Sequence, residues 1–287
     1  MRHSRERPLI MADDADSQRE RASATAVQNL EMEGWLRKAL ERRELALHYQ
    51  PQVELDSGRI VGVEALLRWQ HSILGKASPA ELIPLAERAG LISLLGEWMI
   101  RVACTQVQSW RNLGLPLLRV AVNLPSRQFV DAELAKVIAQ ILRETKLRPD
   151  FLELEITESL LVKEEVIDTL RALKRLGVRL AINDFGADYA NLRHWRQVSL
   201  DRLKINRSFV REIGEETDEQ PIAAAIIAMA RSLRLGVIAD GVETAMQFAF
   251  LRSLRCDEIQ GDWFGPPRPA EQFAALLGNY RKSRHFQ

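Results

Sequence analysis

Strand-like runs alternate with amphipathic helical segments from residue 45 onward, and this alternation limits the possible folds more than any other feature of the chain. The runs are rich in apolar and β-branched residues and stand at 45–55, 60–69, 118–123, 151–157, 178–184, 201–206, 237–240 and 257–261. The first two flank the turn sequence at 56–59, which predicts an antiparallel hairpin. Strands separated by helices form parallel sheets through right-handed crossovers. We therefore predict an α/β fold, a modified TIM (β/α)₈ barrel in which the N-terminal hairpin contributes one antiparallel strand.

Local signals fix some of the predicted helix ends. A helix is expected to begin at 78–81, because Ser78 can cap it, Pro79 suits the first turn and Glu81 completes a capping box. Glycines at 90, 177 and 236 follow helical stretches and are expected to end them.

The segment before the first strand has a different composition. Residues 1–27 are polar and charge-rich, which predicts a flexible tail or the remnant of a linker. Residues 28–44 keep apolar residues at helical spacing and predict a linker helix. The barrel domain is expected over 45–287.

Composition and charge exclude several classes of protein. The chain is 46% hydrophobic and 28% charged, which is typical of a globular protein. Its 40 Lys and Arg residues balance 39 Asp and Glu residues, so no basic surface for nucleic acid is expected. The longest apolar stretch, 222–230, is far shorter than the ~20 residues of a membrane span. Cys104 and Cys256 are isolated from each other and lack zinc-site spacing, which favours a cytoplasmic location.

Oxygen-bearing side chains and one lysine stand at the carboxyl ends of the predicted strands, where barrel enzymes place their chemistry. They are Glu64, Asn123, Glu155, Glu158, Asn183, Asp184, Lys204, Asn206, Asp240, Glu243 and Gln260. One acidic residue at a strand end is usually only solvated, but seven strand ends that deliver such groups to one rim indicate a site. Oxygen ligands without histidine favour Mg²⁺ or Mn²⁺ over zinc. The chain has no HExxH, GxSxG, GxGxxG or P-loop motif, which excludes the usual sites of those classes.

Seven motifs in order give the chain a specific likeness. They are YQPQ with VEALLRW, VNLPSRQF, LELEITES, NDFGADYANL, LKINRSFV, ADGVET and CDEIQG. Together they closely resemble the bacterial EAL domain over roughly 45–275. The resemblance implies a modified (β/α)₈ barrel that binds the second messenger cyclic di-GMP. Active members of that family hydrolyse one phosphodiester bond, giving linear pGpG, with two Mg²⁺ or Mn²⁺ ions.

The same resemblance implies roles for individual residues. Glu64, Asn123 and Glu155 correspond to ligands of one ion, Asp184 and Asp240 to ligands of the other, and Asn183 to the ligand that bridges both. The residues implied in catalysis are Lys204, Asp184 and Asp240, with Lys204 orienting the water or neutralising developing charge. Those implied in binding or bracing the ligand site are Gln50, Arg68, Glu158, Glu243 and Gln260. Arg68 corresponds to an arginine that contacts a phosphate.

Three departures from the family pattern fall on the residues at the strand ends. The active pattern has Asp where this chain has Asn183 and Asn206, and it has Glu where this chain has Asp240. Asn183 removes a full negative charge from the bridging position, and Asp240 is shorter by one methylene. Asp188 also replaces a glycine of the loop that follows.

These departures leave three hypotheses open. The first is a protein that binds cyclic di-GMP while its hydrolysis is weak or lost. The second is an active phosphodiesterase, and the third is a protein-interaction module that no longer binds the nucleotide. The resemblance also implies a homodimer that pairs through the helix after the fifth strand. A diguanylate cyclase or sensor domain in a longer chain is a further expected partner.

Overall fold

The computed structural model describes residues 34, 37–39, 44–71, 75–77, 79–185, 195, 197–214 and 219–283, with the side chains at 70–81, 184, 219–221 and 280–283 outside that description. Residues 1–27 lie outside it entirely. Of the expected linker helix at 28–44, residues 34, 37–39 and 44 are described; residues 34 and 37–39 are helical and residue 44 is not. The proposed division of the chain stays a prediction.

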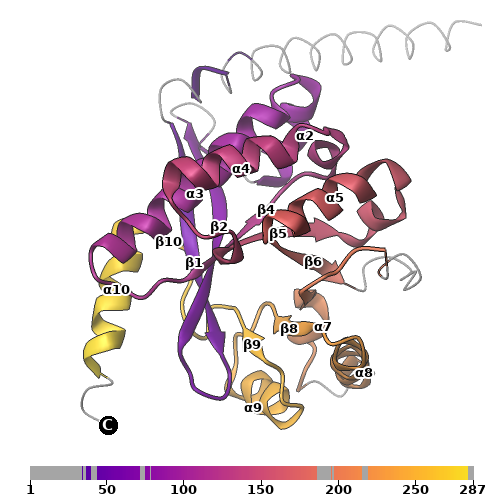
Figure 1. The fold of residues 1–287 in the computed structure, drawn as a ribbon. Helices are drawn as coiled ribbons and strands as arrows, with labels where there is room; N and C mark the ends of the chain where they lie inside the picture. Colours follow the sequence, from indigo (N-terminus) through magenta and orange to yellow (C-terminus); the bar gives the residue numbers. More distant parts are fainter. Residues whose placement is uncertain are drawn as a thin grey trace, which may run out of the picture.

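Eight of the strands described in this structure close into a ring at the centre of the molecule (Figure 1). Their order around the ring is β1 (Leu45–Glu54), β9 (Glu258–Ile259), β8 (Gly236–Ala239), β7 (Arg202–Ile205), β6 (Arg179–Phe185), β5 (Leu152–Thr157), β4 (Arg119–Asn123) and β2 (Ile60–His71). β1 runs antiparallel to both neighbours, and the other pairs in the ring are parallel. The predicted barrel with one antiparallel strand is therefore confirmed.

Two short strands lie outside the ring. β3 (Gly75–Ala77) pairs with β2, and β10 (Arg268–Pro269) pairs with β1.

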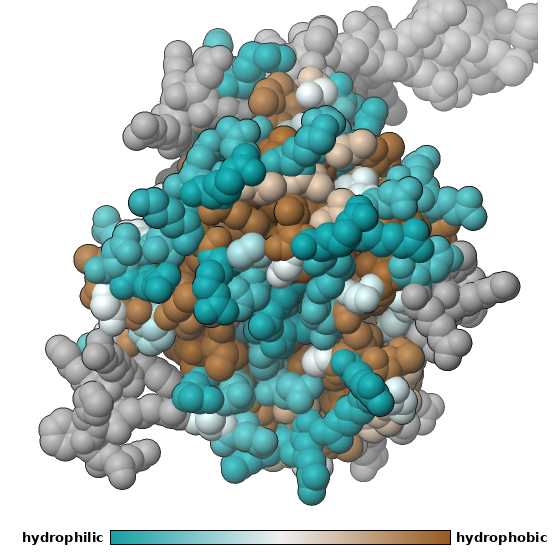
Figure 2. Space-filling model, viewed as in Figure 1, coloured by the Kyte–Doolittle hydropathy of each residue, from teal (hydrophilic) through white to brown (hydrophobic). Residues whose placement is uncertain are grey.

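Helices surround the ring, as the alternating pattern predicts. They are α2 (Pro79–Arg88), α3 (Ile92–Asn112), η1 (Ser126–Val130), α4 (Leu134–Thr145), η2 (Pro149–Phe151), η3 (Glu158–Val162), α5 (Glu164–Leu176), α7 (Arg207–Arg211), α8 (Glu219–Ser232), α9 (Ala245–Ser253) and α10 (Ala270–Ser283). Hydrophilic side chains cover the outer sides of α4 and α5 (Figure 2), while their buried residues are predominantly apolar. Burial of these faces contributes to the apolar core of the protein. Among the described helices, none has the length and apolarity to cross a membrane.

One predicted helix end is wrong. Gly90 and Gly177 take the left-handed conformation after α2 and α5, as expected. Gly236, however, begins β8. After α8 the left-handed position falls on Arg234, at a φ of 59°, so the chain turns two residues earlier than the glycine suggests. α2 begins at Pro79 as predicted, but the capping side chains of Ser78 and Glu81 lie outside the described residues.

The interior of the barrel is charged at the amino-terminal ends of its strands. Arg119 and Arg202 both contact Glu258, at 2.6 Å each, and both contact Glu153, at 3.3 and 3.1 Å. Burial alone would raise the pKa of Glu258, but the two guanidinium groups lower it below its usual value. Two arginines and two glutamates thus neutralise one another in the core, which is the condition under which buried charge is tolerated.

Candidate functional site

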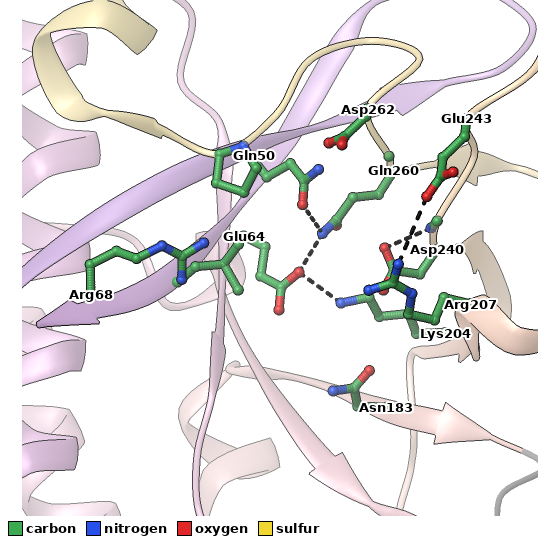
Figure 3. A pocket seen from close by; sticks show the side chains of 14 residues that line it. Gln50, Glu64, Arg68, Asn183, Lys204, Arg207, Asp240, Glu243, Gln260 and Asp262 are labelled. Carbon is green, nitrogen blue, oxygen red and sulfur yellow. Dashed lines mark hydrogen bonds and ion pairs between the residues drawn. The ribbon is translucent and has the colours of Figure 1, made fainter. Parts of the chain in front are cut away.

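A cleft of about 370 Å³ opens at the carboxyl ends of the strands (Figure 3). Residues from the ends of β2, β6, β7, β8 and β9 and the loops after them form most of its wall. The lining residues are Gln50, Glu64, Leu66, Arg68, Asn183, Lys204, Arg207, Asp240, Gly241, Glu243, Gln260, Gly261, Asp262 and Pro267. Most of these are polar or charged, so the cleft suits a polar ligand better than an apolar one.

Lys204 connects two carboxylates at the floor of the cleft. Its Nζ donates to Glu64 Oε2 at 2.8 Å and lies 3.3 Å from Glu155 Oε2. All three side chains are buried. They come from β7, β2 and β5, so closure of the ring is what brings them together.

Burial and charge shift the pKa values of this group in different directions. Burial alone would lower the pKa of Lys204, but Glu155, Glu64 and Asp240 raise it well above its usual value. For Glu64 burial acts to raise the pKa, and the charge and hydrogen bond of Lys204 lower it overall. Burial and the neighbouring Glu64 raise the pKa of Glu155 well above its usual value. The ammonium is therefore charged and paired chiefly with Glu64.

Two glutamines hold Glu64 from the other side. Gln260 Nε2 donates to Glu64 Oε2 and also to Gln50 Oε1, the latter at 3.1 Å. Gln50 in turn donates to the carbonyl oxygen of Gly265 at 3.4 Å. Of the two predicted binding residues, Gln260 therefore contacts Glu64 directly, and Gln50 is linked to Glu64 through Gln260.

Asn183 and Asp240 reach the same cleft from β6 and from the loop after β8 (Figure 3). Asn183 is buried and lies on the side of the cleft opposite Gln260. Asp240 Oδ1 accepts the N–H of Gly241 at 2.9 Å, so this oxygen is turned toward the backbone of its own loop.

Arginines stand on opposite sides of the cleft (Figure 3). Arg68, from β2, is partly buried, and its Nη1 donates to the carbonyl oxygen of Leu67 at 2.8 Å. Arg207, at the start of α7, lies 3.8 Å from a carboxylate oxygen of Glu243. About two thirds of the Arg207 side chain is exposed, at 66%, so this contact leaves the guanidinium accessible from the cleft.

Other predicted site residues lie beside or beneath the cleft. Asn123 and Glu155 are register partners on β4 and β5. Asn123 lines a separate small pocket together with Glu64, and Glu158 is buried at the start of η3. The side chain of Asp184 and all of Asp188 lie outside the described residues, so their roles stay predictions.

Sequence reasoning missed three polar residues of the site. Arg207 and Asp262 line the cleft, and each stands within two residues of a strand-end residue that was identified, so their position was a usable signal. Gln52, which hydrogen-bonds Gln260, is the last residue of the YQPQ motif, but it lies inside a strand rather than at a strand end, and sequence reasoning gave it no role.

Asn206 has a local role in the structure. Its side-chain oxygen accepts the N–H of Ser208 at 2.8 Å and caps α7. Asn and Asp are comparable N-caps, so the substitution at this position preserves the start of the helix.

The residue types around Lys204 fit a divalent cation. Glu64, Glu155 and Asp240 offer three carboxylates against one ammonium, and Asn183 adds an amide oxygen. Among the described side chains, however, no three His, Cys, Asp or Glu residues already stand close enough together to form a metal centre. The ammonium of Lys204 lies between the two glutamates instead.

Comparison with known proteins places the chain in a family. A model of the EAL domain family matches residues 33–267. The bifunctional diguanylate cyclase/cyclic di-GMP phosphodiesterase MucR of Pseudomonas aeruginosa is 41% identical over 257 residues, which cover 89% of this chain and 38% of MucR. The cyclic di-GMP phosphodiesterase PdeR of Escherichia coli is 37% identical over 249 residues, which cover 86% of this chain and 37% of PdeR. The chain thus spans little more than a third of the length of these relatives.

Solved structures agree with this placement. A MucR phosphodiesterase in complex with cyclic di-GMP has a TM-score of 0.80 at 41% identity and covers 86% of this chain, with 99% of its own chain matched. The EAL domain of Mycobacterium smegmatis DcpA has a TM-score of 0.72 at 32% identity and covers 82% of this chain, with 98% of its own matched. On the motifs, the barrel and these matches together, the chain belongs to the EAL domain family.

Proposed function

We propose that this chain binds cyclic di-GMP in the cleft at the carboxyl ends of its strands and that its hydrolysis of the nucleotide is weak or lost. The observation that carries the proposal is a cleft that keeps Arg68 and the Lys204 cluster but has a neutral amide at Asn183. MucR, at 41% identity, has been solved in complex with the same nucleotide.

Binding is supported by the two arginines. Cyclic di-GMP carries two phosphates, and a guanidinium can donate two parallel hydrogen bonds to a phosphate. Arg68 supplies one such group by family likeness. Arg207 is positioned to supply a second when it exchanges its 3.8 Å contact with Glu243 for the ligand. Gln50 and Asp262 add polar groups at the wall.

The metal ligands of the proposal are Glu64, Asn123, Glu155, Asn183, Asp184 and Asp240, and Mg²⁺ or Mn²⁺ suits their oxygens. Bound there, two such ions supply positive charge to the attacking and leaving oxygens of a phosphodiester. The chain's own contribution is Lys204, an ammonium held beside Glu64 that neutralises negative charge as it develops on the phosphate.

Weak hydrolysis follows from two side chains. Asn183 presents a neutral amide where the active pattern has a carboxylate between two cations, and a neutral ligand attracts each cation less. Asp240 is shorter than Glu, and one of its oxygens accepts its own loop's N–H. A displacement of ~1 Å at a reacting centre can reduce turnover ~100-fold.

An active phosphodiesterase is the second candidate. It is favoured by the likeness to MucR and PdeR, which are both named as cyclic di-GMP phosphodiesterases. A nucleotide-free interaction module is the third, and Arg68 in the wall of the cleft speaks against it.

The expectations about a further domain, the oligomeric state and the location in the cell are proposals as well. MucR also carries a diguanylate cyclase activity and is much longer than the matched part, which supports a cyclase or sensor domain beside the barrel in a longer protein. A homodimer through the helix after the fifth predicted strand and a cytoplasmic location stay predictions. Sedimentation of the purified chain tests whether it forms a homodimer.

Calorimetric titration with cyclic di-GMP, with and without Mg²⁺, combined with an assay for pGpG, tests the proposal. We expect binding in both conditions and little pGpG. Binding with rapid production of pGpG would favour the active enzyme, and no binding in either condition would favour the interaction module.

A further inference from the structure

A chain of hydrogen bonds crosses the interior of the barrel from Arg119 to Glu64. Arg119 Nη2 donates to Gln52 Oε1 at 2.8 Å. Gln52 Nε2 donates to Gln260 Oε1 at 3.1 Å, and Gln260 Nε2 donates to Glu64 Oε2. The two amides thus join the charged cluster at the amino-terminal ends of the strands to the carboxylate at the floor of the cleft.

Both amides of this hydrogen-bond chain are almost completely buried. Gln52 is completely buried and Gln260 is 1% exposed. Gly62, on β2, makes the space: a Cβ there would lie 2.6 Å from Gln52 Oε1 and 2.9 Å from Arg119 Nη2. Buried amides without a partner cost free energy, so each amide is held to the partners it has.

The two ends of the chain fix the direction of every bond in it. A guanidinium can only donate, and an ionised carboxylate can only accept. Arg119 therefore requires the oxygen of Gln52 to face it, which directs the NH₂ group of Gln52 to Gln260. The NH₂ group of Gln260 then faces Glu64. Reversal of either amide would set two acceptors or two donors against each other.

Arg119 is itself immobilised at the base. It contacts Glu258 at 2.6 Å and Glu153 at 3.3 Å, and Arg202 contacts the same two glutamates. The donor that starts the chain is therefore held in place by a buried ionic cluster, away from the cleft.

We propose that Gln52 is a positioning residue for the site: through Gln260 it orients and hydrogen-bonds the Glu64 carboxylate that faces the cleft. Gln52 does not line the cleft, and no role follows for it from the motifs of the family. The part of this inference that concerns metal binding rests on the proposed function, whereas the orientation of the Gln260 amide does not.

The deciding variant is Gln52→Glu, which keeps the shape of the side chain and its contact with Arg119 but offers Gln260 an acceptor instead of a donor. The NH₂ group of Gln260 should then turn to residue 52, and Glu64 should lose its hydrogen bond. Side-chain amide resonances in ¹⁵N–¹H NMR report this directly. We expect the Gln260 Nε2 protons to show nuclear Overhauser contacts to the Glu64 side chain in the unaltered chain and to show them to residue 52 instead in the variant. Gln260→Glu removes the resonance and so assigns it.

Mn²⁺ affinity, measured by calorimetry, supplies a second measurement. Loss of a group that orients a metal ligand typically weakens metal binding ~10- to 100-fold, and we expect Gln52→Glu to fall in this range. If Gln52→Glu acted only through its added negative charge, the Mn²⁺ affinity would rise instead, because a carboxylate attracts the cation. On a Gln260→Met background, Gln52→Glu should have no further effect, since Gln52 acts through Gln260.

Gln247→Glu is the matched control. Gln247 is also a buried amide, at 3% exposed, and its oxygen accepts the N–H groups of Glu243 and Thr244, which a carboxylate can equally accept. Its NH₂ group donates to the carbonyl oxygen of Arg211 at 3.3 Å, so Gln247→Glu loses a side-chain donor just as Gln52→Glu does. Gln247→Glu should leave both the contacts of the Gln260 Nε2 protons and the Mn²⁺ affinity unchanged. Gln52→Met replaces Gln52→Glu if the latter does not fold; it removes the donor that holds the Gln260 oxygen, so it should weaken the contacts between Gln260 Nε2 and Glu64 without moving them to residue 52.

Contacts between the Gln260 Nε2 protons and Glu64 that stay unchanged in Gln52→Glu, or in Gln52→Met where that variant is used, would overturn the inference. So would an unchanged or higher Mn²⁺ affinity in Gln52→Glu when the unaltered chain binds the ion. If the unaltered chain binds no Mn²⁺, the metal site of the proposed function fails, and the NMR comparison alone decides the role of Gln52.

Discussion

Lys204 Nζ donates to Glu64 Oε2 at 2.8 Å across the full width of the barrel. Their strands, β7 and β2, are separated by four steps around the ring in either direction, so the two residues face each other through its interior. Glu155 also contacts the ammonium, at 3.3 Å. One lysine thus neutralises carboxylates from two other strands at the floor of the cleft.

Lys204→Met should destabilise the protein in the absence of metal. It leaves Glu64 and Glu155 buried beside each other without a counter-charge, and removal of one partner from a buried ion pair costs about 3 kcal/mol or more. Because a divalent cation can replace the missing charge, Mn²⁺ should restore part of the loss. Urea unfolding with and without Mn²⁺ measures both effects.

Lys136→Met is the control for that experiment. Lys136 pairs with Glu133 on the surface, where such pairs contribute little, and its removal should leave the unfolding free energy nearly unchanged. Equal losses for the two variants would contradict the role assigned to Lys204.

Glu155→Gln should change the pH dependence of stability. Burial and the charge of Glu64 raise the pKa of Glu155, so the folded state holds that proton more tightly than the unfolded state does. The resulting stabilisation is fully present below the unfolded pKa of ~4.3 and is lost as the pH rises through the folded pKa. Glutamine mimics the protonated form at every pH. The unfolding free energy of Glu155→Gln relative to the unaltered chain should therefore increase between pH 5 and pH 8 in metal-free buffer. A constant difference over this range would show that Glu155 does not titrate as proposed.

Arg68→Ala should weaken binding of cyclic di-GMP at least tenfold, with or without Mg²⁺. The expected cause is the loss of a bidentate hydrogen bond to a phosphate. A loss of ~1.4 kcal/mol of binding free energy already corresponds to a tenfold weaker affinity. Calorimetry measures the affinity. Arg59→Ala, which removes an exposed arginine from the β1–β2 turn, should have no effect. Unchanged affinity in Arg68→Ala would mean that the nucleotide is held elsewhere.

Arg207→Ala tests the residue that sequence reasoning missed. Because Arg207 stands at the rim and is largely exposed, we expect a smaller loss of about three- to tenfold, which high salt should reduce. Arg211→Ala, at the other end of the same short helix, is the matched control. Equal affinities of Arg207→Ala and Arg211→Ala for cyclic di-GMP would show that Arg207 takes no part in binding.

The order of strands and the rim of polar residues could be predicted because local patterns encode them. Apolar runs mark each strand, and polar groups at the strand ends follow from their position in a parallel barrel. The fine arrangement of the site could not be predicted in this way. Whether Lys204 pairs with Glu64 or with Glu155 depends on contacts between strands far apart in the chain.

The charged residues inside the barrel could not be predicted from the sequence for a similar reason. Arg119 and Arg202 stand at strand positions where a charged residue usually faces water. Only the closed ring shows that both point inward, onto Glu153 and Glu258. The misassigned end at Gly236 has a local cause, because Arg234 adopts a left-handed conformation that is uncommon for a residue other than glycine.

The rate of pGpG production tests the central claim most directly. It should be compared at matched Mn²⁺ concentration in the unaltered chain, Asn183→Asp, Asp240→Glu and the double variant. Asn183→Asp restores the charge between the ions, and Asp240→Glu restores reach, so the double variant should be fastest, by roughly a hundredfold over the unaltered chain. The two positions share one site, and their effects should not be additive. Turnover by the unaltered chain as fast as that of the double variant would show that Asn183 is a competent ligand and would contradict the proposal that hydrolysis is weak or lost.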